Sequence, residues 1–181
     1  MATIESGYTG PRRTWSERAL GAAKLDVSVF EEVEADTTAT MQAAGVVAIA
    51  AVAQAIAASS GGAGRVIGSL IGALIAWLIW SAVTYFVGVT LFKGTATVGE
   101  LLRTLGFAQA PGVLYVLAIL PVLGGLIALI IAIWILIAGI IAIRQALDIS
   151  TGKAVITAIV GWIVLVIPLA MFGGAAFLAT R

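Results

Sequence analysis

Long stretches without a charged residue alternate with short charged clusters along this chain, and the uncharged stretches predict membrane spans. No charge occurs in residues 37–64, where 41–58 has the length of a helix of about 18 residues, close to the minimum for crossing a bilayer. Two serines and two glycines at 59–62 then interrupt the apolar pattern. Residues 66–92 follow without a charge and are long enough to cross with some tilt.

The next uncharged stretch, residues 104–143, is too long for one span. As a single helix rising about 1.5 Å per residue, it would be roughly twice as long as the hydrocarbon core is thick. Pro121 and the glycine pair Gly124 and Gly125 favour a tight turn inside it. We therefore expect this stretch to double back.

These patterns predict an all-α fold, a polytopic membrane helix bundle with five transmembrane helices. Residues 1–36 are expected to form a cytoplasmic N-terminal segment with an amphipathic helix, and residues 37–181 the membrane domain. The five predicted spans are 41–58, 66–92, 107–122, 124–144 and 153–178.

The N-terminal segment has the pattern of an amphipathic helix. Thr14 and Glu17 have the spacing of a capping box, which marks a helix start. Arg18 and Asp26 interrupt the apolar face that follows. That face consists of Trp15, Ala19, Ala22, Leu25, Val29, Phe30 and Val33.

Composition strengthens the membrane assignment and narrows the chemistry. With 61% hydrophobic and 10% charged residues, the 181-residue chain carries more apolar surface than a soluble fold could bury. It has no cysteine and no histidine, which excludes disulfides, the usual zinc and haem ligands and a histidine base. We expect no catalytic residue, cofactor or metal ion, no nucleic-acid partner, and a protein that is not an enzyme.

The placement of Lys and Arg predicts the orientation, because cytoplasmic loops carry an excess of them. Five spans with the N-terminus inside put eight basic residues in the cytoplasm and two outside, whereas four spans give seven against three. The eight are Arg12, Arg13, Arg18, Lys24, Lys93, Arg103, Arg144 and Lys153, and the two are Arg65 and Arg181. The C-terminus is therefore expected outside.

Small residues recur every four positions in the second span and predict a helix-packing interface. They are Gly64, Gly68, Gly72 and Ala76. Contact with another helix of the same chain is the preferred interpretation, and a dimer or partner interface is the alternative.

Apart from Arg144 and Lys153 at span ends, the predicted spans contain no Asp, Glu, Lys or Arg, which argues against a pump or a proton-coupled transporter. The polar residues at depth are Gln54, Ser81, Thr84, Tyr85, Tyr115 and Thr157. We favour interhelical hydrogen bonds for them over a solute path. A small passive channel or facilitator along Gln54, Ser81, Thr84 and Thr157 stays open as an alternative.

A polar cluster is predicted at the cytoplasmic helix ends. Thr97 and Glu100 repeat the capping-box spacing, which predicts a second short amphipathic helix on this side. Arg144 and Asp148 stand four residues apart and can pair on one helix face. We interpret the cluster as a structural ion-pair network, with partner docking as the alternative. Its members are Glu100, Arg103, Arg144, Asp148 and Lys153.

Four strings in a fixed order give the chain a family resemblance. They are V-F-E-E-V-E-A-D at 29–36, T-Y-F-V-G at 84–88, G-E-L-L-R-T-L-G-F-A-Q-A-P at 99–111 and R-Q-A-L-D at 144–148, followed by Ser150 and Thr151. In this order the chain resembles the bacterial members of the Yip domain family, the Ypt/Rab-interacting membrane proteins. The resemblance implies a five-span bundle with a cytoplasmic N-terminus in a bacterial inner membrane. The Asp-Leu-Tyr-Gly-Pro signature of the eukaryotic branch is absent, so no GTPase-binding residue is carried over.

The sequence thus favours a non-catalytic membrane scaffold or accessory subunit. Such a protein contacts the lipid bilayer and assembles with other membrane proteins or with itself. Abundant packing surface beside little chemistry is the reason for this hypothesis.

Overall fold

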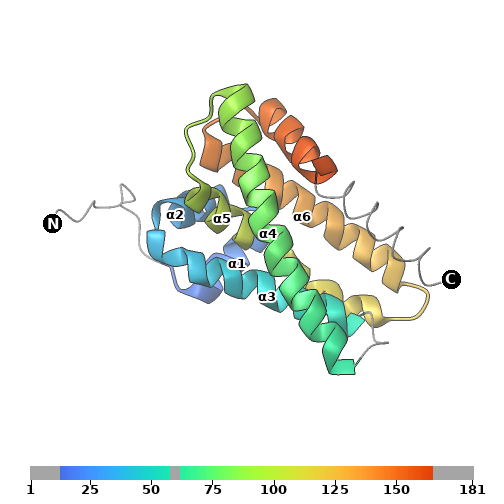
Figure 1. The fold of residues 1–181 in the computed structure, drawn as a ribbon. Helices are drawn as coiled ribbons and strands as arrows, with labels where there is room; N and C mark the ends of the chain where they lie inside the picture. Colours follow the sequence, from blue (N-terminus) through green and yellow to red (C-terminus); the bar gives the residue numbers. More distant parts are fainter. Residues whose placement is uncertain (1–12, 58–61, 165–181) are drawn as a thin grey trace.

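The computed structural model describes residues 13–57 and 62–164, and the regular structure in these residues is entirely helical (Figure 1). Four segments are long and apolar enough to cross a membrane: Thr37–Ala57, Val66–Phe92, Val98–Ile119 and Gly124–Leu147. A shorter apolar helix, Thr151–Val164, ends the described chain. The all-α fold class is confirmed for the described residues, with four candidate spans. Residues 1–12, and the part of the predicted span 153–178 beyond residue 164, lie outside the described residues.

Two short helices replace the single N-terminal amphipathic helix that the pattern predicts. The capping box at Thr14 and Glu17 is present and begins α1 (Trp15–Ala23). Leu25 has a positive φ of 63°, which ends the helical path. Asp26 then accepts a hydrogen bond from the Ser28 N–H and begins α2 (Val27–Ala35). Asp26 interrupts the apolar face because it is an N-cap.

The first two predicted spans fall on two long helices. Asp36 caps the short 3₁₀ helix η1 (Thr37–Ala39), which continues into α3 (Thr40–Ala57). The long helix α4 (Gly62–Phe92) has 31 residues and contains the predicted second span. Lys93, with a φ of 59°, turns the chain out of it.

The third span begins nearer the N-terminus than the sequence indicates. The capping box at Thr97 and Glu100 is confirmed and begins α5 (Val98–Phe107). Ala108 keeps helical dihedrals, and the chain continues into the 3₁₀ helix η2 (Ala110–Ile119). By length and composition the candidate span is Val98–Ile119, whereas the sequence pattern places the start of the third span at Phe107. Since six of its ten residues are buried, α5 belongs to the core.

The chain doubles back after η2, as predicted. Val122 takes a positive φ of 69° in the turn that joins η2 to α6 (Gly124–Leu147), and these two elements then pack together. Asp148, with a φ of 53°, forms the left-handed C-cap of α6.

The central element of the fold is α5, which contacts α2, α3, α4 and α6. In Figure 1 the short helices α1, α2 and α5 lie together, with α5 beside the middle of α4, where Trp77 donates to the Leu102 carbonyl. Close backbone approach explains two glycines here. A methyl group on Gly106 would lie 2.6 Å from Ala43 Cβ, and one on Gly112 would lie 2.7 Å from Ala50 Cβ. Small residues therefore let α5 and η2 pack tightly along α3.

Candidate functional site

The glycine face of α4 points away from the rest of the described chain. A methyl group on Gly64, Gly68 or Gly72 would have no described atom within 4 Å, and all three glycines are exposed. Within the described residues, no other helix of this chain makes the close contact that the preferred interpretation expects at these glycines. The close helix contacts inside the chain use Gly106 and Gly112 instead.

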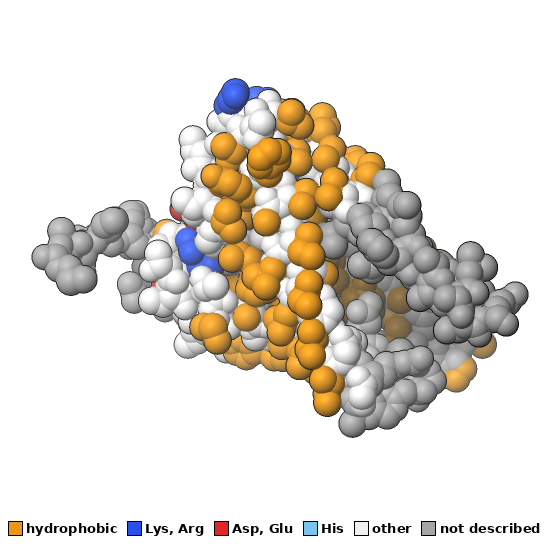
Figure 2. Space-filling model, in the orientation of Figure 1, with side chains coloured by type: hydrophobic (Ala, Val, Ile, Leu, Met, Phe, Trp, Pro, Cys, Tyr) orange, Lys and Arg blue, Asp and Glu red, His pale blue; other side chains and the backbone are white. Residues whose placement is uncertain are grey.

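Among the four candidate spans, α4 is the least covered. Only 11% of its most apolar window is buried, against 28–50% for the other three. Hydrophobic side chains follow α4 along its length in Figure 2, where this helix faces the viewer. The exposed surface of α4 thus combines apolar side chains with a row of glycines, which permits another helix to approach closely.

A cleft of about 730 Å³ lies between α3, α4, η2, α6 and the helix Thr151–Val164. Ala76, the fourth small residue of the predicted interface, lines it together with Ala73 of the same helix. Its aromatic lining residues are Trp77, Trp80, Tyr115 and Trp162, and its polar lining residues with carboxamide groups are Gln54 and Gln109. No charged residue lines this cleft within the described chain.

Three of the predicted intramembrane polar residues are fully buried where α4 meets the last described helix. They are Ser81, Thr84 and Thr157, each with 0% of its surface exposed. Thr157 donates to the Lys153 carbonyl of its own helix at 2.9 Å, while the hydroxyls of Ser81 and Thr84 have no partner among the described residues. The interhelical hydrogen bonds expected for these three hydroxyls are absent from the described part of the chain.

The predicted solute path is not continuous in this structure. Gln54 lines the cleft, whereas Ser81, Thr84 and Thr157 do not. Trp80 and Thr84 instead pack against Gly161: a methyl group there would lie 2.9 Å from Trp80 Nε1 and 3.3 Å from Thr84 Oγ1. Tyr85 packs partly buried against the hydrophobic core. The structure therefore does not favour a channel along these residues.

A buried ion-pair network joins α1, α2 and the start of α3. Arg18 lies 2.9 Å from Glu32 and 2.8 Å from Asp36, and Arg13 lies 2.9 Å from Glu32. Arg18 also donates to the Gln42 side chain at 3.0 Å. Arg18 and Glu32 are 2% and 1% exposed, so both charges depend on these partners. The sequence pattern does not predict this network, because Arg18 stands among apolar residues on its helix face and appears there only as an interruption.

Arg103 holds the carboxyl end of α2. Its guanidinium donates from Nε to the carbonyl oxygens of Val33 at 2.9 Å and Glu34 at 3.1 Å, and from Nη2 to Glu34 again. These carbonyls belong to the last turn of α2, where no helical N–H is available to them. The predicted ion-pair role of Arg103 is therefore replaced by hydrogen bonding to a helix end.

The other members of the predicted polar cluster also form no ion pair within the described residues. Arg144 donates to Gln145 at 3.0 Å, and Asp148 accepts from the Thr95 hydroxyl at 3.1 Å. The Lys153 ammonium lies 6.0 Å from the centroid of the Phe92 ring. The left-handed backbone of Asp148 takes it off the helix that carries Arg144, which explains why the expected pair does not form.

Glu34 is the group in this region with a raised pKa. The pKa of Glu34 is raised to about 7, first by burial and then by the carboxylates of Glu100, Asp148 and Glu31, while Arg103 opposes the rise. The pKa of the Asp36 carboxyl is shifted in the opposite direction. Burial would raise its pKa, but hydrogen bonds from Thr38 and Arg18 outweigh burial and lower it.

Neither the cleft nor the polar cluster offers a metal site. Within residues 13–57 and 62–164, no group of three or more Asp and Glu side chains is placed to hold a metal ion. What the described residues offer is hydrogen bonding, apolar surface and an exposed glycine row.

Comparison with known proteins gives one match. The model of the Yip1 domain family matches residues 28–172, which includes α2 to α6 and the helix that follows. No curated protein and no solved structure matches the chain significantly. The match covers most of the 181 residues and every transmembrane candidate. The chain therefore belongs to the Yip1 domain family.

Proposed function

We propose that this protein is a non-catalytic membrane scaffold or accessory subunit that assembles through the exposed glycine face of α4. One observation carries the proposal: Gly64, Gly68 and Gly72 form a row on α4, which contains the least covered candidate span, and a methyl group on any of them would have no described atom within 4 Å. Glycines on a lipid-facing surface weaken a helix without packing benefit, whereas a second helix against them gains close contact.

The proposed arrangement has five spans. Residues 1–36 form the cytoplasmic segment and residues 37–181 the membrane domain, with the C-terminus outside a bacterial inner membrane. The excess of Lys and Arg on the N-terminal side supports this orientation. The exposed members of the polar cluster, Asp148 and Lys153, then face the cytoplasm and are available to a soluble or membrane-bound partner.

Native mass spectrometry from mild detergent tests the assembly, with Gly68→Ile and Gly72→Ile as the disruptive variants. We expect the wild type to retain a second copy or a stoichiometric membrane partner, and both variants to lose it. Gly125→Ile is the matched control, because Gly125 is also exposed with no described atom within 4 Å but lies on α6. A monomeric wild type, or equal loss in the Gly125 variant, would count against the proposal.

A further inference from the structure

The cleft between α3, α4, η2 and α6 has the size and lining of a small-molecule site. Its volume of about 730 Å³ falls inside the range of roughly 300–1,000 Å³ typical of such sites. It is lined mainly by aliphatic and indole side chains with a few polar groups, which is the usual composition of a ligand pocket.

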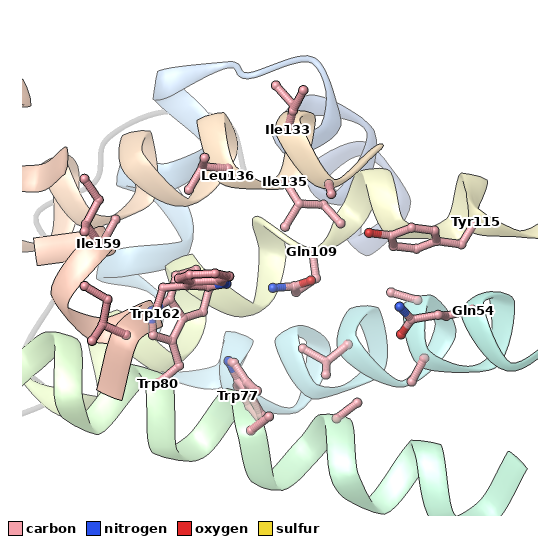
Figure 3. Close-up of a pocket in the computed structure, with 18 residues that line it drawn as sticks. Gln54, Trp77, Trp80, Gln109, Tyr115, Ile133, Ile135, Leu136, Ile159 and Trp162 are labelled. Atoms are coloured by element: carbon pink, nitrogen blue, oxygen red, sulfur yellow. The ribbon is translucent and has the colours of Figure 1, made fainter. Parts of the chain in front are cut away.

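The polar groups in the cleft have unused hydrogen-bonding capacity. The side chains of Gln54, Gln109 and Tyr115 make no hydrogen bond to described residues. Figure 3 shows Gln109 between the indole rings of Trp80 and Trp162 on one side and Tyr115 and Gln54 on the other. Two carboxamides and a phenol supply N–H and O–H donors, so they suit an oxygen acceptor within the cleft.

The lining also limits the charge and shape of a ligand. Because no described charged residue lines the cleft, an ionised ligand would lose its hydration without a counter-charge. The rings of Trp77, Trp80 and Trp162 favour a planar ring that can stack on them or meet their edges. A plain acyl chain would leave the carboxamides without partners.

We propose that this cleft binds an uncharged, planar, lipid-soluble ring compound that carries a carbonyl oxygen. Gln109 and Tyr115 hydrogen-bond the oxygen, and the indole rings enclose the ring system. The proposal does not depend on the assembly through α4, since the glycine row at Gly64, Gly68 and Gly72 does not line the cleft.

Equilibrium dialysis of the protein in phosphatidylcholine nanodiscs tests the proposal with two matched probes. Menadione has a planar ring with two carbonyl oxygens, and 2-methylnaphthalene has the same ring system and methyl group without oxygen. We expect saturable binding of menadione, about tenfold tighter than that of 2-methylnaphthalene, after subtraction of empty nanodiscs. The chain has no cysteine, so thiol adducts of menadione do not complicate the measurement.

Two variants connect binding to the polar groups. Gln109→Leu and Tyr115→Phe are each expected to weaken menadione binding severalfold to tenfold and to leave 2-methylnaphthalene unchanged. Gln145→Leu is the matched control, because Gln145 lies outside the cleft and bonds Glu31. If the Gln109→Leu protein does not fold, the Tyr115→Phe variant tests the proposal by itself, because this substitution removes only the phenol oxygen. Equal affinity for both probes, no binding of either, or unchanged menadione binding in the folded variants would overturn the proposal.

Discussion

Arg103 donates from its guanidinium to the carbonyl oxygen of Val33 at 2.9 Å, across 70 positions of the chain. This bond attaches α5, the central element of the fold, to the last turn of α2. Arg103 is 6% exposed, so water has little access to replace the bond.

Removal of this guanidinium is the first prediction. Arg103→Leu should lower the free energy of unfolding by about 1–3 kcal/mol, because buried carbonyls at the end of α2 lose their donor. Thermal unfolding in detergent measures the effect. Arg144→Leu is the control and should change the midpoint little, since Arg144 bonds only its neighbour Gln145 among the described residues. Equal effects of the two variants would contradict the assigned role.

The buried Arg18–Glu32 pair gives the second prediction. Glu32→Leu leaves the buried Arg18 charge with Asp36 and Gln42 as its remaining partners, and should destabilise the protein by about 1–3 kcal/mol. The double variant Arg18→Met/Glu32→Leu should recover part of the loss, because it removes the buried Arg18 charge and leaves Asp36 with its hydrogen bonds from Thr38. A double-mutant cycle by thermal unfolding measures the coupling, and strictly additive losses would refute it.

Glu34 gives the third prediction, a pH dependence. Its pKa in the folded protein is about 7, against the ordinary pKa of 4.5 for glutamate, so the folded state binds the proton more tightly than the unfolded state. The stability contributed by this group is therefore fully present below about pH 4.5 and falls as the pH rises through 7.

Glu34→Gln should remove this slope and raise the unfolding midpoint at pH 8 relative to the wild type. The gain should be of order 1 kcal/mol, since Glu34 keeps part of its surface in water and screening reduces the cost of its charge. Unfolding midpoints measured at pH 5 and pH 8 provide the test. A wild-type slope that persists in Glu34→Gln would show that other groups cause it.

The fourth prediction contrasts two glycines under one substitution. Gly106→Ala should destabilise the fold, because the new methyl group lies 2.6 Å from Ala43 Cβ and 3.2 Å from the Ala43 backbone. Gly68→Ala should be neutral or stabilising by up to about 1 kcal/mol, since alanine favours a helix and meets no described atom. Thermal unfolding of both variants should show opposite signs, and a loss of similar size in both would contradict the structure.

Thr84 gives the fifth prediction. Its hydroxyl is buried without a partner in the described chain, so Thr84→Val should stabilise the protein by about 1 kcal/mol. Thr157→Val is the matched control, because the Thr157 hydroxyl bonds the Lys153 carbonyl and its loss gains nothing. Unfolding midpoints compare the two. Destabilisation by Thr84→Val would indicate that the hydroxyl has a partner in the membrane.

Local signals in the sequence predict local structure well. The capping boxes at Thr14 and Thr97 each begin a helix, because their hydrogen bonds involve residues within one turn. The turn at Pro121 follows from span length and turn residues alone, and the doubling back is confirmed.

Such local signals do not predict which residues a side chain contacts in the tertiary structure. The pattern that marks Gly64, Gly68 and Gly72 as a packing face does not say whether this chain covers it. The sequence places Arg103 in a surface ion-pair cluster, whereas in the structure α5 is part of the core and Arg103 is buried with it. The cleft residues Gln109 and Tyr115 come together only through the arrangement of several helices.

Two hydrogen bonds join the loop that follows α4 to the loop that follows α6. The Thr95 N–H donates to the Leu147 carbonyl at 3.3 Å, and the Thr95 hydroxyl donates to Asp148. Reporters inserted in these two loops must therefore report the same compartment, whichever compartment that is. Glycosylation or thiol-labelling sites placed there provide an internal standard, against which the two chain ends can each be assigned a side.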